Sequence, residues 1–292
     1  MIAVEHLSAA RKPEFLSRLN LNWGPGVHGV IALPSDGVRL LSSVLAGLVR
    51  PASGRVTVLG ASPSSPHVRR CIAAVPVDVS LPSRLNVEEI FRVADVLRGD
   101  SALREPAERL TTFRIERLLR RTVRSLSRAE VRAVAIAEAL TAPSVKVLIV
   151  DDPLVDMDFR VVGAIPEALR SKSRDGCAVV VTTASLRDAT ALADDFTFLR
   201  AGKVVDETTS IAAASTFGVH GEMMALTRNE PDARALATAL VSEPDVQGFD
   251  VKLSSIVVRG NDPIALGRAV GHAAIEANVD IVELSATPEA SR

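Results

Sequence analysis

The fold is decided by the stretch Val27-His28-Gly29-Val30-Ile31-Ala32-Leu33-Pro34-Ser35-Asp36-Gly37-Val38-Arg39-Leu40-Leu41-Ser42-Ser43-Val44-Leu45-Ala46-Gly47-Leu48. Its apolar start predicts a short strand, its polar middle a loop, and its end a helix from about Arg39 to Leu48. A strand, loop and helix in this order form the frame of a phosphate-binding P-loop, G-x-x-x-x-G-K-[ST]. Of the residues that define this motif, only Gly37 is present. The stretch therefore predicts the frame of a nucleotide site without its usual chemistry.

Six further segments follow this loop in a fixed order. They are Ala46–Val56, Ala73–Asp78, Leu126–Glu130, Val147–Asp158, Val179–Ser185 and Phe198–Val205. In that order they resemble the glycine hairpin, Q-loop, LSGGQ signature, Walker B with D-loop, switch strand and closing hairpin of the ABC transporter ATP-binding family. The resemblance covers about residues 1–208, and with its C-terminal extension the chain is similar to the ATPases of ABC-2 type exporters.

The resemblance implies an α/β fold, with a P-loop NTPase-like ABC ATPase core at 1–208 and a helical subdomain inserted at about 80–140. Two continuous apolar runs, Val145–Val150 and Ala178–Thr183, agree with such a core. Strands of a parallel sheet that helices cover on both faces lose the alternation of apolar and polar residues.

The end of the chain has a different pattern. Residues 209–221 are rich in Ala, Ser and Thr, and their apolar pattern fades, which predicts a linker. Beyond it, 222–292 predicts a small α+β domain of ferredoxin-like order, βαββαβ. Its expected elements are Met223–Thr227, Asp232–Val241, Phe249–Leu253, Ser255–Arg259, Pro263–Glu276 and Val279–Leu284.

Composition excludes several classes of protein. The 292 residues are 47% hydrophobic and 24% charged with a net charge of -1, which is ordinary for a soluble protein and argues against a nucleic-acid partner. The arginines from Arg114 to Arg124 predict a solvated helix face, or alternatively a face for a partner or anionic lipid. No run approaches the roughly 20 apolar residues of a membrane span, and no signal peptide is recognisable, so a cytoplasmic location is expected. Cys71 and Cys177 are isolated and predict buried, reduced thiols rather than a metal site.

The loop residues oppose phosphate binding. Pro34 removes a backbone N–H donor, Asp36 places a carboxylate where phosphate oxygens would lie, and Ala32 restricts a turn that favours glycine. Val38 replaces the P-loop lysine and Arg39 the hydroxyl residue that holds Mg²⁺. Losing two charge-assisted contacts of about 1.5–3 kcal/mol each weakens binding about 10²- to 10⁴-fold.

The resemblance assigns four further positions, and each departs from the family pattern. Arg11 lies near the position of the aromatic residue that stacks on adenine, although an arginine can also stack on a base. Val77 takes the Q-loop glutamine position and Ala184 the switch histidine position. Asp152 takes the catalytic glutamate position with a side chain one methylene shorter, and a misplacement of about 1 Å can lower a rate about 10²-fold. No catalytic residue is therefore expected at these positions, and no metal ion.

The residues that could still contact a nucleotide are Gly37, Arg39, Arg11, Asp151 and Ser127. In the signature, Leu126-Ser127-Arg128-Ala129-Glu130, only the first two residues match the family, so the second half of a shared site is degraded as well. No cofactor is expected, and ATP with Mg²⁺ would bind weakly if at all.

Asp151 would be an uncompensated buried charge without Mg²⁺, and such a charge is costly. We therefore expect Arg39 to reach Asp151 or Asp152 and to fill the site from within the chain. In the alternative, Arg39 points to solvent and a water molecule satisfies Asp151.

Three functions compete at this stage. The first is a noncatalytic ABC subunit that docks on a membrane permease at the cytoplasmic face and pairs with an intact ATPase or a like copy. Val77, Asp78 and Leu81–Leu85 would line the docking groove of such a subunit. The second is a regulatory or scaffold protein that uses the fold to bind other proteins. The third is a weak ATPase with a pocket rebuilt from Arg11, Arg39, Arg128 and Asp151.

Overall fold

A computed structural model describes residues 1–100, 105–208, 221–260 and 263–286 of this chain. The chain divides into two units, Met1–Thr209 and Ser210–Arg292. Of the predicted linker, residues 209–220 lie outside the described residues, and Gly221 begins strand β10. Each unit is described below by itself.

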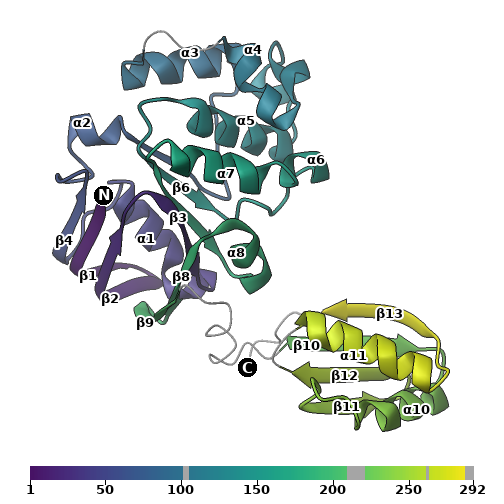
Figure 1. Cartoon of the computed structure of the whole chain (residues 1–292). Helices are drawn as coiled ribbons and strands as arrows, with labels where there is room; N and C mark the ends of the chain where they lie inside the picture. The colour runs from purple at the N-terminus through teal and green to yellow at the C-terminus, as the bar shows by residue number, and fades with distance from the viewer. Residues whose placement is uncertain (101–104, 209–220, 261–262, 287–292) are drawn as a thin grey trace. The chain divides into compact units, whose positions relative to one another are not determined.

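A six-stranded sheet forms the centre of the first unit (Figure 1). Its order is β5 (Ile72–Val75), β6 (Val147–Asp151), β7 (Ala178–Thr183), β3 (Gly26–Ile31), β8 (Asp195–Arg200) and β9 (Lys203–Thr208). All neighbouring strands are parallel except β8 and β9. Asp151 pairs with Thr182, and Ile31 pairs with Thr183. This register brings the loop after β3 and the carboxylate at the end of β6 to the same edge of the sheet.

A second sheet has the order β2 (Glu14–Trp23), β1 (Ile2–Arg11) and β4 (Ser53–Val58), all antiparallel. Helix α1 (Val38–Leu45) contacts strands of both sheets. Its residues Leu40, Leu41, Val44 and Leu45 are buried in one core with residues of both sheets. The predicted helix is therefore present but ends three residues earlier than expected, because Gly47 adopts a left-handed backbone conformation (φ +71°) that stops it.

The predicted helical insertion consists of two longer helices, α3 (Val87–Arg98) and α5 (Arg128–Thr141), joined by short helical elements. The short elements are α4 (Pro106–Arg109) and the 3₁₀ turns Thr111–Phe113, Glu116–Leu118 and Val123–Ser125. The remaining helices of this unit are α2 (Pro66–Arg69), α6 (Phe159–Val162), α7 (Ile165–Arg174), α8 (Leu186–Leu192) and the 3₁₀ turn Pro34–Asp36.

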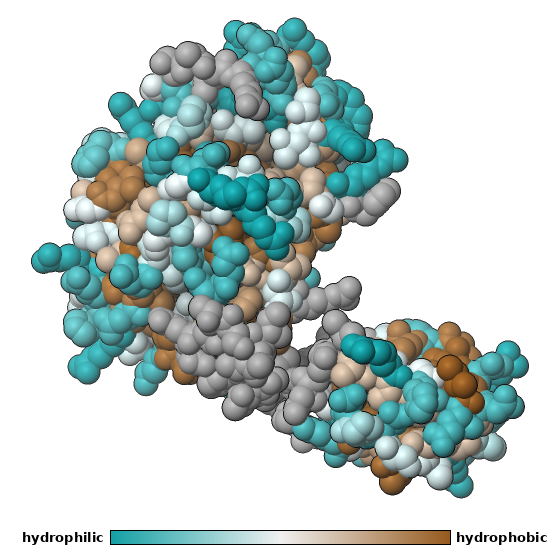
Figure 2. All heavy atoms as spheres, viewed as in Figure 1, coloured by the Kyte–Doolittle hydropathy of each residue, from teal (hydrophilic) through white to brown (hydrophobic). Residues whose placement is uncertain are grey.

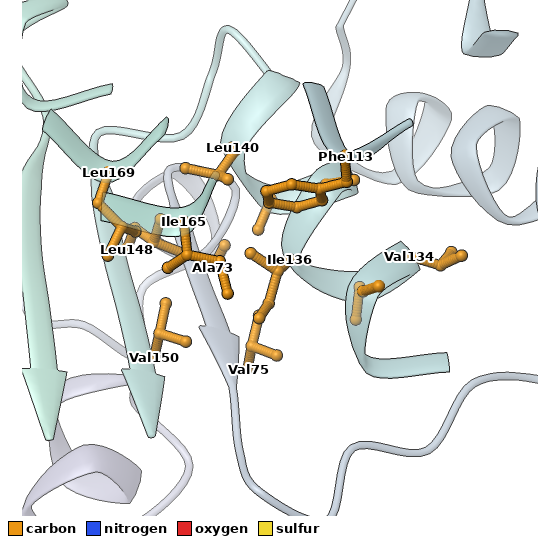
Figure 3. Packing of buried hydrophobic residues seen from close by; sticks show 14 of the residues in the cluster. Ala73, Val75, Phe113, Val134, Ile136, Leu140, Leu148, Val150, Ile165 and Leu169 are labelled. Carbon is orange, nitrogen blue, oxygen red and sulfur yellow. The ribbon is translucent and has the colours of Figure 1, made fainter. Parts of the chain in front are cut away.

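The insertion shares a core with the central sheet. Figure 3 shows Phe113 of the insertion beside Ile136 and Leu140 of α5, and in the same cluster Leu148 and Val150 of β6. Because α5 is buried along most of its length, the residues at its start are held in place relative to the end of β6.

The second unit has the order βαββαβ. Its elements are β10 (Gly221–Thr227), α10 (Glu230–Leu240), β11 (Gly248–Lys252), β12 (Ser255–Gly260), α11 (Pro263–Glu276) and β13 (Ile281–Ala286). The strands form an antiparallel sheet in the order β11-β12-β10-β13. Both helices contribute to its core, with Leu236 and Leu240 of α10 beside Val270 of α11.

Figure 2 shows a face on which hydrophilic and hydrophobic residues are interspersed in both units. Within the ranges that the structure describes, no helix has the length and apolar character needed to cross a bilayer.

Candidate functional site

The loop after β3 binds its own acidic side chain. Pro34–Asp36 form one 3₁₀ turn, and Gly37 follows with a left-handed backbone (φ +90°). Asp36 Oδ2 accepts a hydrogen bond from the Leu33 N–H at 3.0 Å, and Asp36 Oδ1 accepts one from the Ala201 N–H at 2.8 Å. The Asp36 carboxylate therefore uses a backbone N–H of the loop as its hydrogen-bond donor. It also joins the loop to the β8–β9 turn.

The next two positions face in opposite directions. Val38 is 7% exposed and belongs to the core around α1. The side chain at the lysine position of the P-loop motif therefore packs in the core. Arg39 is exposed, and among the described residues no carboxylate lies within 4.0 Å of its guanidinium. The expected ion pair between Arg39 and Asp151 or Asp152 is therefore wrong.

Asp151 is satisfied by two hydroxyl groups instead. Its Oδ1 accepts hydrogen bonds from Ser42 Oγ and from Thr182 Oγ1, both at 2.8 Å. Burial raises the pKa of Asp151, and these two hydrogen bonds oppose that rise. Ser42 lies three residues after Arg39, about one helical turn, on the buried face of α1. A short hydroxyl reaches the carboxylate from there without burying a second charge, and this explains why Arg39 is not needed.

A buried guanidinium joins the ends of two strands of the central sheet. Arg132 of α5 is 3% exposed. Its Nη2 donates to the backbone carbonyls of Asp151 and Asp152, the latter at 2.7 Å, and its Nη1 donates to the Val77 carbonyl at 3.2 Å. Burial lowers the pKa of the Arg132 guanidinium, against the influence of the nearby aspartates. Its Nε is buried without a hydrogen-bond partner in the described part of the chain.

Arg132 therefore links three of the predicted site residues, Val77, Asp151 and Asp152, through their backbones. Asp152 has a left-handed backbone (φ +43°), and its N–H donates to the Thr182 carbonyl at 2.7 Å. Ala184 is exposed and follows β7 directly. The side chains of Val77 and Ala184 have no polar atom, whereas Asp152 keeps a carboxylate one methylene shorter than that of glutamate.

The start of α5 is occupied by its own helix cap. Ser127 Oγ accepts from the Glu130 N–H at 3.2 Å, and Glu130 Oε2 accepts from the Ser127 N–H at 3.0 Å. This reciprocal pair is a capping box, which satisfies the free N–H groups of a helix start. Glu130 also pairs with Arg117 at 2.9 Å. The predicted contact residue Ser127 thus has a structural partner, beside a hollow of about 320 Å³ that Asp158 and Arg160 also line.

An aromatic residue lies closer to the loop than the sequence suggested. Arg11 is exposed and pairs with Glu14 at the end of the β1–β2 hairpin. Phe15 is 46% exposed; its backbone lies against Gly37, and its backbone and ring lie against Gly202. An exposed aromatic ring is therefore present near the loop, in addition to the predicted Arg11.

Comparisons with known proteins identify the relatives of this chain. The family model described as "ABC transporter" matches residues 37–155. A molybdate/tungstate import ATP-binding protein of Archaeoglobus fulgidus is 31% identical over 198 residues, which are 65% of this chain and 81% of the relative. The chain belongs to the ABC transporter ATP-binding family.

Further family members differ in length and role. A daunorubicin resistance ATP-binding protein of Streptomyces coeruleorubidus is 31% identical over 195 residues, 63% of this chain and 60% of that protein. The dimeric post-hydrolysis structure of an ATP-binding cassette with ADP and phosphate has a TM-score of 0.62 at 20% identity, over 72% of this chain and 98% of that one. Relatives of this chain are thus ATP-binding proteins of import and drug-resistance systems, and the fold of the first unit is that of an ABC ATPase.

Three residues of this site were not predicted from the sequence. Ser42, Thr182 and Arg132 were overlooked because none of them is a motif residue. Ser42 could have been found from its position one helical turn after Arg39. Thr182 could have been found from the expected pairing of β6 with β7. Arg132 had no such signal, since its carbonyl partners are up to 55 positions away in the sequence.

The backbone around Gly37 leaves no room for a side chain. A Cβ at this position would lie 2.5 Å from the Phe15 carbonyl oxygen, and the backbone is left-handed (φ +90°). We expect Gly37→Ala to lower the free energy of unfolding by about 1–3 kcal/mol, measured by chemical denaturation. Gly176→Ala is the control for conformation alone, since its φ of +82° is similar and no atom lies within 4 Å of its Cβ position. If both variants lose the same free energy of unfolding, the close approach of the Phe15 carbonyl to position 37 has no effect on stability.

Proposed function

We propose that this chain is a noncatalytic ABC subunit, which couples or regulates transport without hydrolysing ATP itself. The observation that carries the proposal is that the polar groups of the former nucleotide site bond to one another. Asp151 is held by Ser42 and Thr182, and Arg132 is held by backbone carbonyls. Asp151 and both Nη atoms of Arg132 thus have partners within the protein.

The residues present do not fit Mg-ATP. A Mg²⁺ ion needs oxygen ligands around it and usually keeps several waters. Asp151 is the one carboxylate in the expected position, and the hydroxyl and amide ligands are replaced by Arg39 and Val77. A guanidinium repels a cation, and a valine side chain has no ligand atom, so no step of hydrolysis follows from this site.

A membrane permease is the partner that the surface supports. Helix α3 exposes Val93, Val96 and Leu97 at 44%, 79% and 70%. These positions are spaced to form one stripe along a helix. Leu97 also lines a hollow of about 530 Å³ together with Arg69 and Arg70, which are exposed. Such a surface fits a segment with apolar and acidic side chains on one helix face.

This surface differs from the groove expected from the sequence. Leu81 packs against the core of the insertion, and Asp78 pairs with Arg128 at 3.0 Å. The hollow is lined instead by α2 and the end of α3, outside 77–85. We therefore assign docking to α3 and Arg69–Arg70.

Pairing with a second ATP-binding subunit belongs to the same proposal. A cassette with the same fold is dimeric in a solved structure. A partner with intact motifs would supply the hydrolysis that this chain lacks, and a like copy would leave the complex without it. Either way we place the chain at the cytoplasmic face of a membrane, held there by its partner.

Fractionation of cells that express the tagged chain tests this function. We expect the chain in the membrane fraction, with cross-links to an integral membrane protein, and we expect Val96→Asp with Leu97→Asp to move it to the soluble fraction. The double variant buries two charges in an apolar interface, and each costs several kcal/mol unless it is paired. Leu48→Asp is the matched control, because Leu48 is 67% exposed at the end of α1.

Two results would count against docking through α3. One is a soluble wild-type chain that cross-links only to soluble proteins, which favours the scaffold alternative. The other is a double variant that stays on the membrane as well as Leu48→Asp does.

A further inference from the structure

Three side chains that bind metals well converge in the second unit. His272 and Glu276 lie on α11, and Glu243 lies just after α10. One ligand atom from each residue lies within 4.8 Å of the other two. The closest approach is 2.5 Å, between His272 Nδ1 and Glu243 Oε1.

The backbone holds these three residues in place. His272 and Glu276 are four residues apart on one helix, so their side chains share a face. The Glu243 N–H donates to the Leu240 carbonyl, and the Glu243 carbonyl accepts from the Val246 N–H, both at 3.2 Å. The two helices pack through Leu240 and Val270 in the core of this unit. The cluster is therefore built on fixed elements rather than on a free loop.

Among the described residues, His272 is the one basic side chain within 4.0 Å of these two glutamates. Within the described residues neither Glu243 nor Glu276 has a lysine or arginine within 4.0 Å. Arg268 lies one turn before His272 on α11, and it forms no ion pair with either glutamate. Two carboxylates that share a site repel each other unless a cation lies between them. His272 contacts Glu243 and carries at most one positive charge, whereas a bound dication carries two.

We propose that Glu243, His272 and Glu276 bind a divalent transition-metal ion, with Zn²⁺ as the ion that this donor set suits best. One imidazole nitrogen and two carboxylate oxygens are ordinary ligands of Zn²⁺, at about 2.0–2.2 Å. Small side-chain movements, of about 1 Å, bring three atoms from the observed spacing to that distance. Water fills the remaining position. The ion ties the turn after α10 to the last turn of α11.

Calorimetric titration of the full chain with Zn²⁺ tests the site. We expect one ion per chain with a dissociation constant in about the micromolar range. His272→Ala and Glu276→Gln should each weaken binding by at least about tenfold, since loss of even an indirect ligand contact costs about 10- to 100-fold. Both residues are exposed, so the variants are expected to fold. Glu283→Gln is the matched control, because Glu283 is an exposed carboxylate on β13 of the same unit.

Two further measurements separate this site from other ligands. Co²⁺ bound by the three residues should give visible absorption that His272→Ala abolishes. Zn²⁺ should slow amide hydrogen exchange at Val246, because its N–H bonds to Glu243. The proposal is wrong if the wild-type chain does not bind Zn²⁺ at about 1 mM, or if the variant with both His272→Ala and Glu276→Gln binds it unchanged.

Discussion

Titration of the purified chain with Mg-ATP at millimolar nucleotide is expected to give no heat of binding. Intact P-loops hold phosphate through backbone N–H groups and a lysine. Here Pro34 lacks an N–H, the Leu33 N–H binds Asp36, and Val38 lies in the core. The loss of two charge-assisted contacts alone weakens binding about 10²- to 10⁴-fold. No ATP hydrolysis above the buffer rate is expected either.

A rebuilt pocket is the outcome that would contradict this expectation. It would appear as a dissociation constant below about 100 μM, equivalent to about 5.5 kcal/mol. Arg39→Ala would then weaken binding by at least about tenfold, because a guanidinium can grip a phosphate with two hydrogen bonds. Arg50→Ala is the matched control, since Arg50 is also exposed and lies beyond the other end of α1. Phe15→Ala tests whether the exposed ring beside Gly202 stacks on the base.

Arg132→Met is expected to lower the free energy of unfolding of the first unit by about 2–4 kcal/mol. Three carbonyls lose their donor, that of Asp151 in a buried contact and those of Asp152 and Val77 in partly buried ones. A buried polar group left unsatisfied costs about 1–3 kcal/mol. Removing a buried charge and its unpartnered Nε recovers part of this cost. Chemical denaturation followed by tryptophan fluorescence measures the change, because Trp23 is the single tryptophan and lies in β2.

Arg128→Met is the matched control for this measurement. Arg128 lies on the same helix, and its ion pair with Asp78 joins side chains that are 78% and 72% exposed. Exposed pairs contribute about 0–1 kcal/mol. If both variants lose the same small amount, Arg132 is not the link between the ends of β5 and β6 that we infer.

Secondary-structure elements with a clear local sequence pattern were predicted more accurately than those that depend on contacts with distant residues. Strands β6 and β7 were evident from continuous apolar runs, and α11 was predicted with its observed bounds, since Pro263–Glu276 has the pattern of a half-buried helix. Within the predicted helical subdomain, the sequence pattern also favours a helix at Ile115–Leu119, and the structure has a single 3₁₀ turn there, Glu116–Leu118. A segment this short is stabilised by its packing, here by the burial of Leu118, and its own residues do not determine which kind of turn it forms.

The order of the motifs along the chain was enough to identify the family and to show which residues of the P-loop motif are replaced. Each motif position follows a strand or begins a helix, so its residue type can be read without knowing its neighbours in space. Only the tertiary structure decided what replaces the P-loop chemistry. Ser42 meets Asp151 across 109 positions, and Asp36 meets Ala201 across 165. Arg39 and Ser42 were both available to Asp151, and the packing of α1 against β6 selected the short, neutral hydroxyl over the long cation.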